Sequence, residues 1–413
     1  MENGALGVET YEIGHPNNAS LAYLAYLIII LLSFYLIVTK RGLRISFKRY
    51  TKDYDFNSTG FFIMLINIVL LLFMLFVVGG IDVLLHKVEK GEFRSNLGIF
   101  GLPAYLIRDN ITPTLIAYLS FVYVKSEAKS KRISFLIINY LLAAFISSSF
   151  GFKSGAVFAV LPGFILLFWQ ISLKLIIKLS FFFLFVFVLT AVFIDKREFK
   201  LNDLKHISFS SPDYNNALNS VLYRATVVQG NTSWHIWEAY INGKKFFDYP
   251  PTLVAVFGDR FLNKVLNINR EDFPKYVKFH YTESLTLETG IRTIDHIKAG
   301  HTTIGQVFSE GIIAGGLIGL IIFALFAGFF TGLNFKIIEG ALLNGNAIAA
   351  SLMINYFVTF IIGWLNGGGI VALFHISAIL GLVINYTFLF CIISLQGILI
   401  KNQLLSKQIS DKM

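Results

Sequence analysis

The sequence predicts an all-α polytopic membrane protein of about nine transmembrane helices, with one large and partly helical loop outside the membrane. Of the 413 residues, 55% are hydrophobic and only 15% are charged, whereas soluble domains carry about 25% charged residues. Apolar runs also recur from residue 20 to residue 400. Each run is long enough to cross a hydrocarbon core about 30 Å thick, so a water-soluble fold is not predicted.

The apolar runs define the spans and, through them, the organisation of the chain. The predicted spans are 20–39, 59–85, 104–124, 133–150, 155–171, 178–194, 311–333, 346–365 and 370–399. The last run is long for one span, and we expect a kink or break near Gly381. The predicted parts are an N-terminal membrane bundle (1–194), a large loop (195–310), C-terminal membrane helices (311–400) and a tail (401–413).

The distribution of charge predicts the orientation. With the N-terminus outside, the cytoplasmic segments carry sixteen Lys and Arg and the short external segments carry five. This asymmetry is the positive-inside pattern, and it predicts a periplasmic N-terminus and a cytoplasmic C-terminus in a bacterial inner membrane. The first nineteen residues hold no Lys or Arg, so they do not form a cleavable signal peptide.

Successive loops lie on alternate sides of the membrane, and this alternation predicts that the large loop lies outside. Apolar residues at helical spacing in 216–228 and 250–266 predict short helices on the membrane surface. An aromatic run that includes Trp234, Trp237 and Tyr240 has two interpretations. Such residues anchor proteins at the headgroup level, and they also stack on sugars.

Several function classes are disfavoured by what the sequence lacks. The net charge of +10 fits basic loops on anionic lipids better than nucleic-acid binding. A single cysteine, Cys391, allows neither an intramolecular disulfide nor a Cys-based metal site. No Walker loop, GxSxG elbow or HExxH motif is present, which disfavours ATP-driven transport and the common hydrolases. No DxD-like carboxylate pair lies at a span end in the first external loop, so the metal-dependent design is not favoured and we expect no metal and no cofactor. An enzyme built from these residues would stabilise charge with Arg, Lys and His.

The segment from His301 to Gly316 combines an imidazole, a carboxylate and glycines at the outer edge of the seventh predicted span. His301 could accept a hydroxyl proton near neutral pH, although a hydrogen-bonded structural role is the alternative. Glu310 is a weaker candidate for the same chemistry. The glycines at 311, 315 and 319 permit close helix packing.

These residues resemble a known pattern. The segment is similar to the His-to-Gly motif of the O-antigen polymerase and ligase superfamily, with Thr302 and the early Gly311 as departures. The turn at 147–155, which carries Lys153, resembles the Gly-Ser-basic turn of many such polymerases. Arg224 resembles their loop arginine. For Lys153 the alternative is a side chain that extends to the headgroups.

Arg108 draws attention on physical grounds alone. The segment 111–124 is too short to span a membrane, so the third helix must begin earlier and carry Arg108 and Asp109 into the bilayer. An ionisable residue at that depth faces a cavity or a partner. The simpler interpretation is a local ion pair of Arg108 with Asp109 or Asp82.

The resemblance implies a glycosyltransferase of GT-C-like architecture that polymerises undecaprenyl-pyrophosphate-linked oligosaccharide repeat units at the periplasmic face. Arg224, Arg292, Lys153 and, in reserve, Arg108 would bind the pyrophosphate, with His301 and Glu310 as catalytic groups. The implied partners are membrane lipids, a flippase and a chain-length regulator, and not nucleic acid. The alternatives are an O-antigen ligase, a flippase or other transporter, and a receptor or scaffold.

Overall fold

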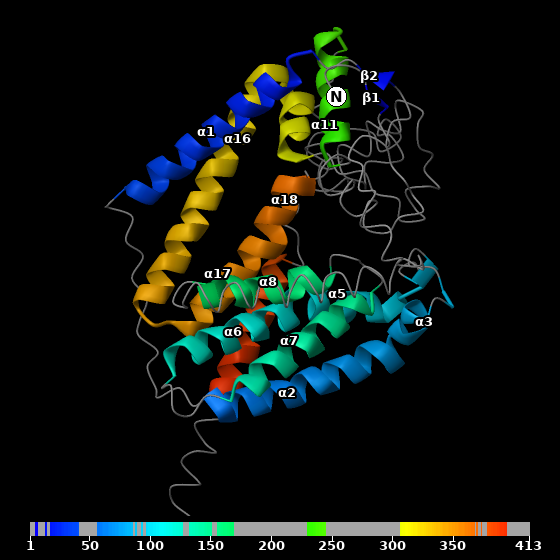
Figure 1. Ribbon diagram of the computed structural model, residues 1–413, viewed down its shortest axis with the longest axis vertical. Coiled ribbons are helices and arrows are strands. Elements are labelled where there is room, and N and C mark those ends of the chain that lie inside the picture. The colour runs from blue at the N-terminus through cyan, green and yellow to red at the C-terminus, as the bar shows by residue number, and fades with distance from the viewer. Residues whose placement is uncertain are drawn as a thin grey trace, which may run out of the picture. The chain divides into compact units, whose positions relative to one another are not determined.

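Figure 1 shows the computed structural model of the chain. It describes residues 5–6, 13–14, 17–40, 56–85, 87–88, 92–93, 96–126, 132–150, 155–168, 229–244, 306–367, 369–370, 373 and 378–394. The chain divides into two compact units. Unit 1 comprises Met1–Leu43, Asp195–Lys336 and Phe360–His375, and unit 2 comprises Arg44–Ile194, Ile337–Thr359 and Ile376–Met413.

Almost all of the described structure is helical. The exception is a pair of two-residue antiparallel strands, β1 (Ala5–Leu6) and β2 (Ile13–Gly14). Within the described residues, the helices long and apolar enough to cross a membrane are Ala19–Thr39, Phe56–Val77, Gln306–Leu343 and Ala347–Gly367. These four helices fit the prediction of an all-α, multi-pass membrane protein.

The count of nine spans stays a prediction. Three predicted spans coincide with shorter apolar helices, α7 (Ile133–Ser148), α8 (Gly155–Phe168) and Ala378–Ser394. A helix of 16 residues is about 24 Å long, which is less than the hydrocarbon thickness. The break expected near Gly381 is not there, because the helix Ala378–Ser394 continues through that residue. The predicted span 178–194 lies outside the described residues.

In unit 1, helix α1 (Ala19–Thr39) lies beside α16 (Gln306–Leu343) (Figure 1). The buried residues of α1 are Ala19, Tyr26 and Ser33, seven residues apart, so α1 contacts its neighbours along one stripe. Ser33 donates a hydrogen bond from Oγ to the Leu325 carbonyl at 2.8 Å. The remaining surface of α1 exposes large apolar side chains, as a lipid-facing helix must.

The predicted glycine ladder forms a corner inside α16. The backbone leaves helical geometry at Gly315 and Gly316, where Gly316 has a φ of 61°. A Cβ on Gly311 would lie 2.8 Å from the Leu320 Cα, and a Cβ on Gly319 would meet the Gly311 carbonyl. The glycines therefore allow two arms of one helix to approach each other, which differs from the ladder on one continuous helix that the spacing of four predicted.

Unit 2 is a bundle around α6 (Thr112–Lys125), in which every residue from Thr112 to Val122 is buried. Helix α6 packs on α8 and on α17 (Ala347–Tyr356), while α7 packs on α2 (Phe56–Leu72) and α8. A polar contact links α2 and α7 in the core: Asn67 donates from Nδ2 to Asn139 Oδ1 at 2.9 Å. Asn139 in turn donates to the Gly60 carbonyl at 3.0 Å. Hydrogen bonds of this kind between helices fix their register in an apolar core.

The second predicted span is shorter than expected. Helix α2 continues as the π-helix η1 (Phe73–Val77), and the chain then turns at Gly79, whose φ is 87°. The short helix α3 (Gly80–Leu84) follows, then an exposed ion pair between Lys87 and Asp82 at 3.7 Å. The span therefore ends near Val77 and not at residue 85.

The third predicted span is a continuous helix that begins at residue 101. A 3-10 turn, η2 (Gly98–Phe100), leads into α5 (Gly101–Leu106), the π-helix η3 (Ile107–Ile111) and then α6. This confirms the prediction that the helix starts well before residue 111. The π-helix contains Arg108 and Asp109, and π-turns of this type often occur at functional sites.

We expect Gly163→Ala to destabilise unit 2. A Cβ at Gly163 would lie 2.5 Å from Tyr140 Oη and 2.7 Å from Ser120 Oγ, two atoms that already share a 2.6 Å hydrogen bond. Such overpacking costs about 1–3 kcal/mol, which thermal unfolding of the purified protein would detect. Gly101→Ala is the matched control, since its nearest neighbour would be Leu97 Cβ at 3.6 Å. Equal unfolding temperatures for the two variants would contradict the packing of α8.

Candidate functional site

The first candidate site, in unit 2, is built around Arg108. Its Nε donates to Asp109 Oδ1 at 2.6 Å and its Nη2 donates to Asp109 Oδ2 at 2.7 Å. The guanidinium carbon lies 4.8 Å from the centre of the Tyr105 ring and 4.8 Å from that of the Phe150 ring. The Arg108 side chain is 14% exposed. The charge is therefore held in one place by two rings and a carboxylate, and solvent screens it only partly.

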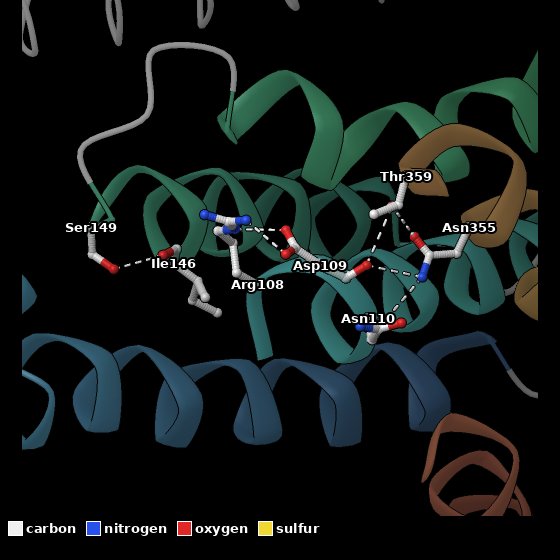
Figure 2. Close-up of polar contacts among 7 residues, drawn as sticks. All are labelled: Arg108, Asp109, Asn110, Ile146, Ser149, Asn355 and Thr359. Carbon is white, nitrogen blue, oxygen red and sulfur yellow. Dashed lines mark hydrogen bonds and ion pairs between the residues drawn. The ribbon is translucent and has the colours of Figure 1, made fainter. Parts of the chain in front are cut away.

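Two side chains from another part of unit 2 hold the backbone that carries this ion pair (Figure 2). Asn355 donates from Nδ2 to the carbonyls of Asp109 and Asn110 at 3.2 and 3.3 Å, and Thr359 donates to the Asp109 carbonyl at 3.3 Å. Asn355 Oδ1, at 3.0 Å, is a second acceptor for the same Thr359 hydroxyl proton. These two side chains come from α17 and from a third π-helix, η8 (Phe357–Ile361). They satisfy carbonyls at the π-turn, where the regular helical pairing is interrupted.

The site adjoins the turn at 147–155. Phe150 is fully buried and ends the serine-rich segment after α7, where Ser149 donates from Oγ to the Ile146 carbonyl at 2.6 Å. Lys153 lies outside the described residues. Phe150, which belongs to the same segment 147–155, is described. The fold thus brings Arg108 to the turn that the sequence singled out independently.

Comparisons of the chain with models of protein families, with curated proteins and with solved structures found no match.

The second candidate site, in unit 1, contains Glu310, which is 2% exposed. Its carboxylate accepts hydrogen bonds from Trp364 Nε1 at 3.0 Å, from the Gly369 N–H at 2.9 Å and from the Ile370 N–H at 2.7 Å. Gly369 has a φ of 83°. With Gly369 in this left-handed conformation, two successive N–H groups reach one carboxylate, an arrangement that binds anions.

These contacts describe Glu310 as an anchor. They join the first arm of α16 to α18 (Ile362–Gly367) and to the turn that follows it. Three of about four acceptor positions on the carboxylate are in use, which leaves little capacity to take a substrate proton. The catalytic role of Glu310 stays a prediction, and the observed geometry supports a positioning role.

Near Glu310, an aromatic cluster covers the start of α16. Helix α11 (Gln229–Ile241) contributes Trp237, whose ring centre lies 6.1 Å from that of Phe308, while Tyr26 meets Phe308 edge to face at 5.5 Å. Trp237 is buried and donates from Nε1 to the Asn17 carbonyl at 2.8 Å. The sequence predicted a headgroup anchor or a sugar platform here, and for Trp237 the structure shows a packing role instead.

Four of the six predicted site residues, namely Lys153, Arg224, Arg292 and His301, lie outside the described residues. The surface helices predicted at 216–228 and 250–266 lie there too. Arg108 pairs with Asp109, one of the two partners considered for it, while Asp82 pairs with Lys87. Among the described residues no group of three or more His, Cys, Asp or Glu is placed to hold a metal ion.

Sequence reasoning missed Asn355, Thr359 and Trp364. A signal was present for the first two, because they are polar residues one helical turn apart in an otherwise apolar span. No comparable signal identified Trp364, whose indole N–H reaches across to Glu310 from a distant part of the chain.

Proposed function

We propose that this protein polymerises undecaprenyl-pyrophosphate-linked oligosaccharide repeat units into a surface polysaccharide, by glycosyl transfer that needs no metal. The reaction would occur at the periplasmic face of a bacterial inner membrane, in a chain of about nine spans and GT-C-like architecture, with the N-terminus periplasmic and the C-terminus cytoplasmic. The observation that carries the proposal is the position of Arg108 against Phe150, in the turn that resembles a polymerase motif.

The chemistry needs cations at the membrane surface. An acceptor hydroxyl attacks the anomeric carbon of the donor sugar, and the bond from that carbon to the pyrophosphate oxygen breaks. The hydroxyl proton passes to a base, for which His301 is the candidate. The electron pair leaves with the pyrophosphate, whose growing negative charge Arg108, Lys153, Arg224 and Arg292 would stabilise.

A second function is favoured by a specific observation. Broken helices are a feature of secondary transporters, in which backbone groups at the breaks bind substrates or ions. Here α16 breaks at Gly315 and Gly316, and N–H groups after α18 bind the buried carboxylate of Glu310. A flippase or other transporter of lipid-linked oligosaccharide is therefore the alternative to a polymerase.

One reconstitution experiment separates these functions. Purified protein in vesicles is given a lipid-linked repeat unit, and the glycan on the carrier lipid is sized with and without EDTA. We expect a ladder of lengths in both conditions. Movement of the unaltered substrate across the bilayer would identify a transporter instead. Transfer of the glycan to added lipid A core would indicate a ligase, and a strict metal requirement would contradict the proposed mechanism.

A further inference from the structure

The Arg108–Asp109 pair has a geometry that suggests how a diphosphate binds. We propose that the Asp109 carboxylate occupies the place of a ligand oxyanion on Arg108, and that an isoprenoid diphosphate binds by displacing it. Asp109 would then be a specificity-determining residue that admits only anions able to compete with a carboxylate. This inference rests on the proposed function, because it takes the diphosphate as the ligand class.

The first argument is the shape of the ion pair. Both Asp109 oxygens accept from one edge of the guanidinium, Nε at 2.6 Å and Nη2 at 2.7 Å. Phosphates bind arginine in the same two-bond arrangement, which is why arginine is used at phosphate sites. The carboxylate therefore fills one of the two guanidinium edges through which a phosphate can bind.

The second argument is that the Arg108 guanidinium has more contacts with the protein than the Asp109 carboxylate has. Arg108 packs against both the Tyr105 and Phe150 rings and its side chain is 14% exposed, whereas the Asp109 side chain is 28% exposed. Within the part of the chain that the structure describes, Arg108 is the hydrogen-bonding partner of that carboxylate. The Asp109 main chain is held separately, by Asn355 and Thr359. The carboxylate can thus rotate away without movement of the helix.

The third argument concerns the protein when no ligand is bound. Neighbouring side chains on a regular α-helix point in different directions and do not pair well. This pair forms on the π-helix η3, where the path of the chain is altered. A cation in an apolar setting is costly without a counter-ion. Asp109 supplies that counter-ion when no ligand is bound, and a diphosphate, with more charge than one carboxylate, replaces it.

The test measures binding of geranylgeranyl diphosphate to the full-length protein in nanodiscs of neutral lipid. Asp109→Asn removes the competing charge and is expected to bind the diphosphate about tenfold more tightly than the native protein does. Arg108→Gln is expected to weaken binding at least about tenfold. Geranylgeraniol, which has no phosphate, is expected to bind all variants equally. Asp82→Asn is the matched control, since Asp82 forms an exposed ion pair with Lys87 in the same unit.

Two further variants keep the test decisive. Asp109→Ala provides a second neutral side chain if Asp109→Asn is unstable, and Asp109→Glu keeps the competing charge and should not tighten binding. Unchanged or weaker diphosphate binding by folded neutral variants would show that the pair is only structural. If wild-type protein polymerises substrate but neutral variants bind no more tightly, this inference fails and the proposed function stands. If neutral variants bind more tightly but no variant polymerises, the proposed function fails alone.

Discussion

Replacing Glu310 by alanine is expected to destabilise the protein by on the order of 3–5 kcal/mol. The change leaves the indole N–H of Trp364 and the N–H groups of Gly369 and Ile370 without their acceptor in a buried setting. It also opens a cavity at a residue that is 2% exposed. Thermal unfolding followed by tryptophan fluorescence measures the effect, with Trp364 as a reporter next to the mutated residue.

Two variants sharpen this test. Glu310→Gln keeps one oxygen acceptor but points an amide N–H at donors, so its stability should fall between those of the alanine variant and the native protein. Glu339→Ala, a partly exposed glutamate on the same helix, should unfold almost like the native protein. A Glu310→Gln protein of native stability that polymerises about a hundredfold more slowly would restore Glu310 to the catalytic groups and contradict the anchor role.

Under the proposed function, replacing Arg108 by glutamine is expected to slow polymerisation by about a hundredfold. Removal of one preorganised donor to a developing charge costs on the order of 3 kcal/mol in the transition state. Arg108→Lys should recover part of the rate, because lysine keeps the charge but loses the two-bond fork and the contacts with the Tyr105 and Phe150 rings. The measurement is the initial rate of chain growth with purified lipid-linked repeat units.

The control for Arg108 is Lys87→Gln, which breaks an exposed ion pair in the same unit and should leave the rate unchanged. The stability of each variant is measured in parallel, because loss of Arg108 leaves Asp109 without its counter-ion. A native rate for Arg108→Gln, at native stability, would show that the Arg108–Asp109 pair has no part in the reaction.

The helices were predictable because lipid imposes a simple rule on sequence. Long apolar runs without charges must form helices in a bilayer, so the predicted span 20–39 corresponds closely to α1, whereas 311–333 includes the break in α16 and ends ten residues before that helix does. The breaks were harder to predict. Gly79 and Gly316 have positive φ, while Gly101 and Gly381 lie in ordinary helices. A glycine in the sequence does not show whether it will break a helix or lie inside one, because contacts with other segments determine its conformation.

The site was only partly predictable for a related reason. Arg108 was found because a charge in an apolar span is costly and therefore informative. Its aromatic neighbours gave no such signal: Phe150 is one of 42 phenylalanines, and only the fold places it against Arg108. The same holds for Glu310, whose three hydrogen-bond donors gave no signal in the sequence.

The π-helix at Ile107–Ile111 has a consequence for changes in chain length. A π-turn contains one residue more than the α-turn it replaces. Deleting a single residue there would restore regular α-helix and leave Gly101–Leu106 in register with α6, because the π-turn spans the same rotation with one residue more. The helix would survive, but the altered chain path on which the neighbours Arg108 and Asp109 pair would be lost. In this segment the number of residues, as much as their identity, determines which way the arginine faces.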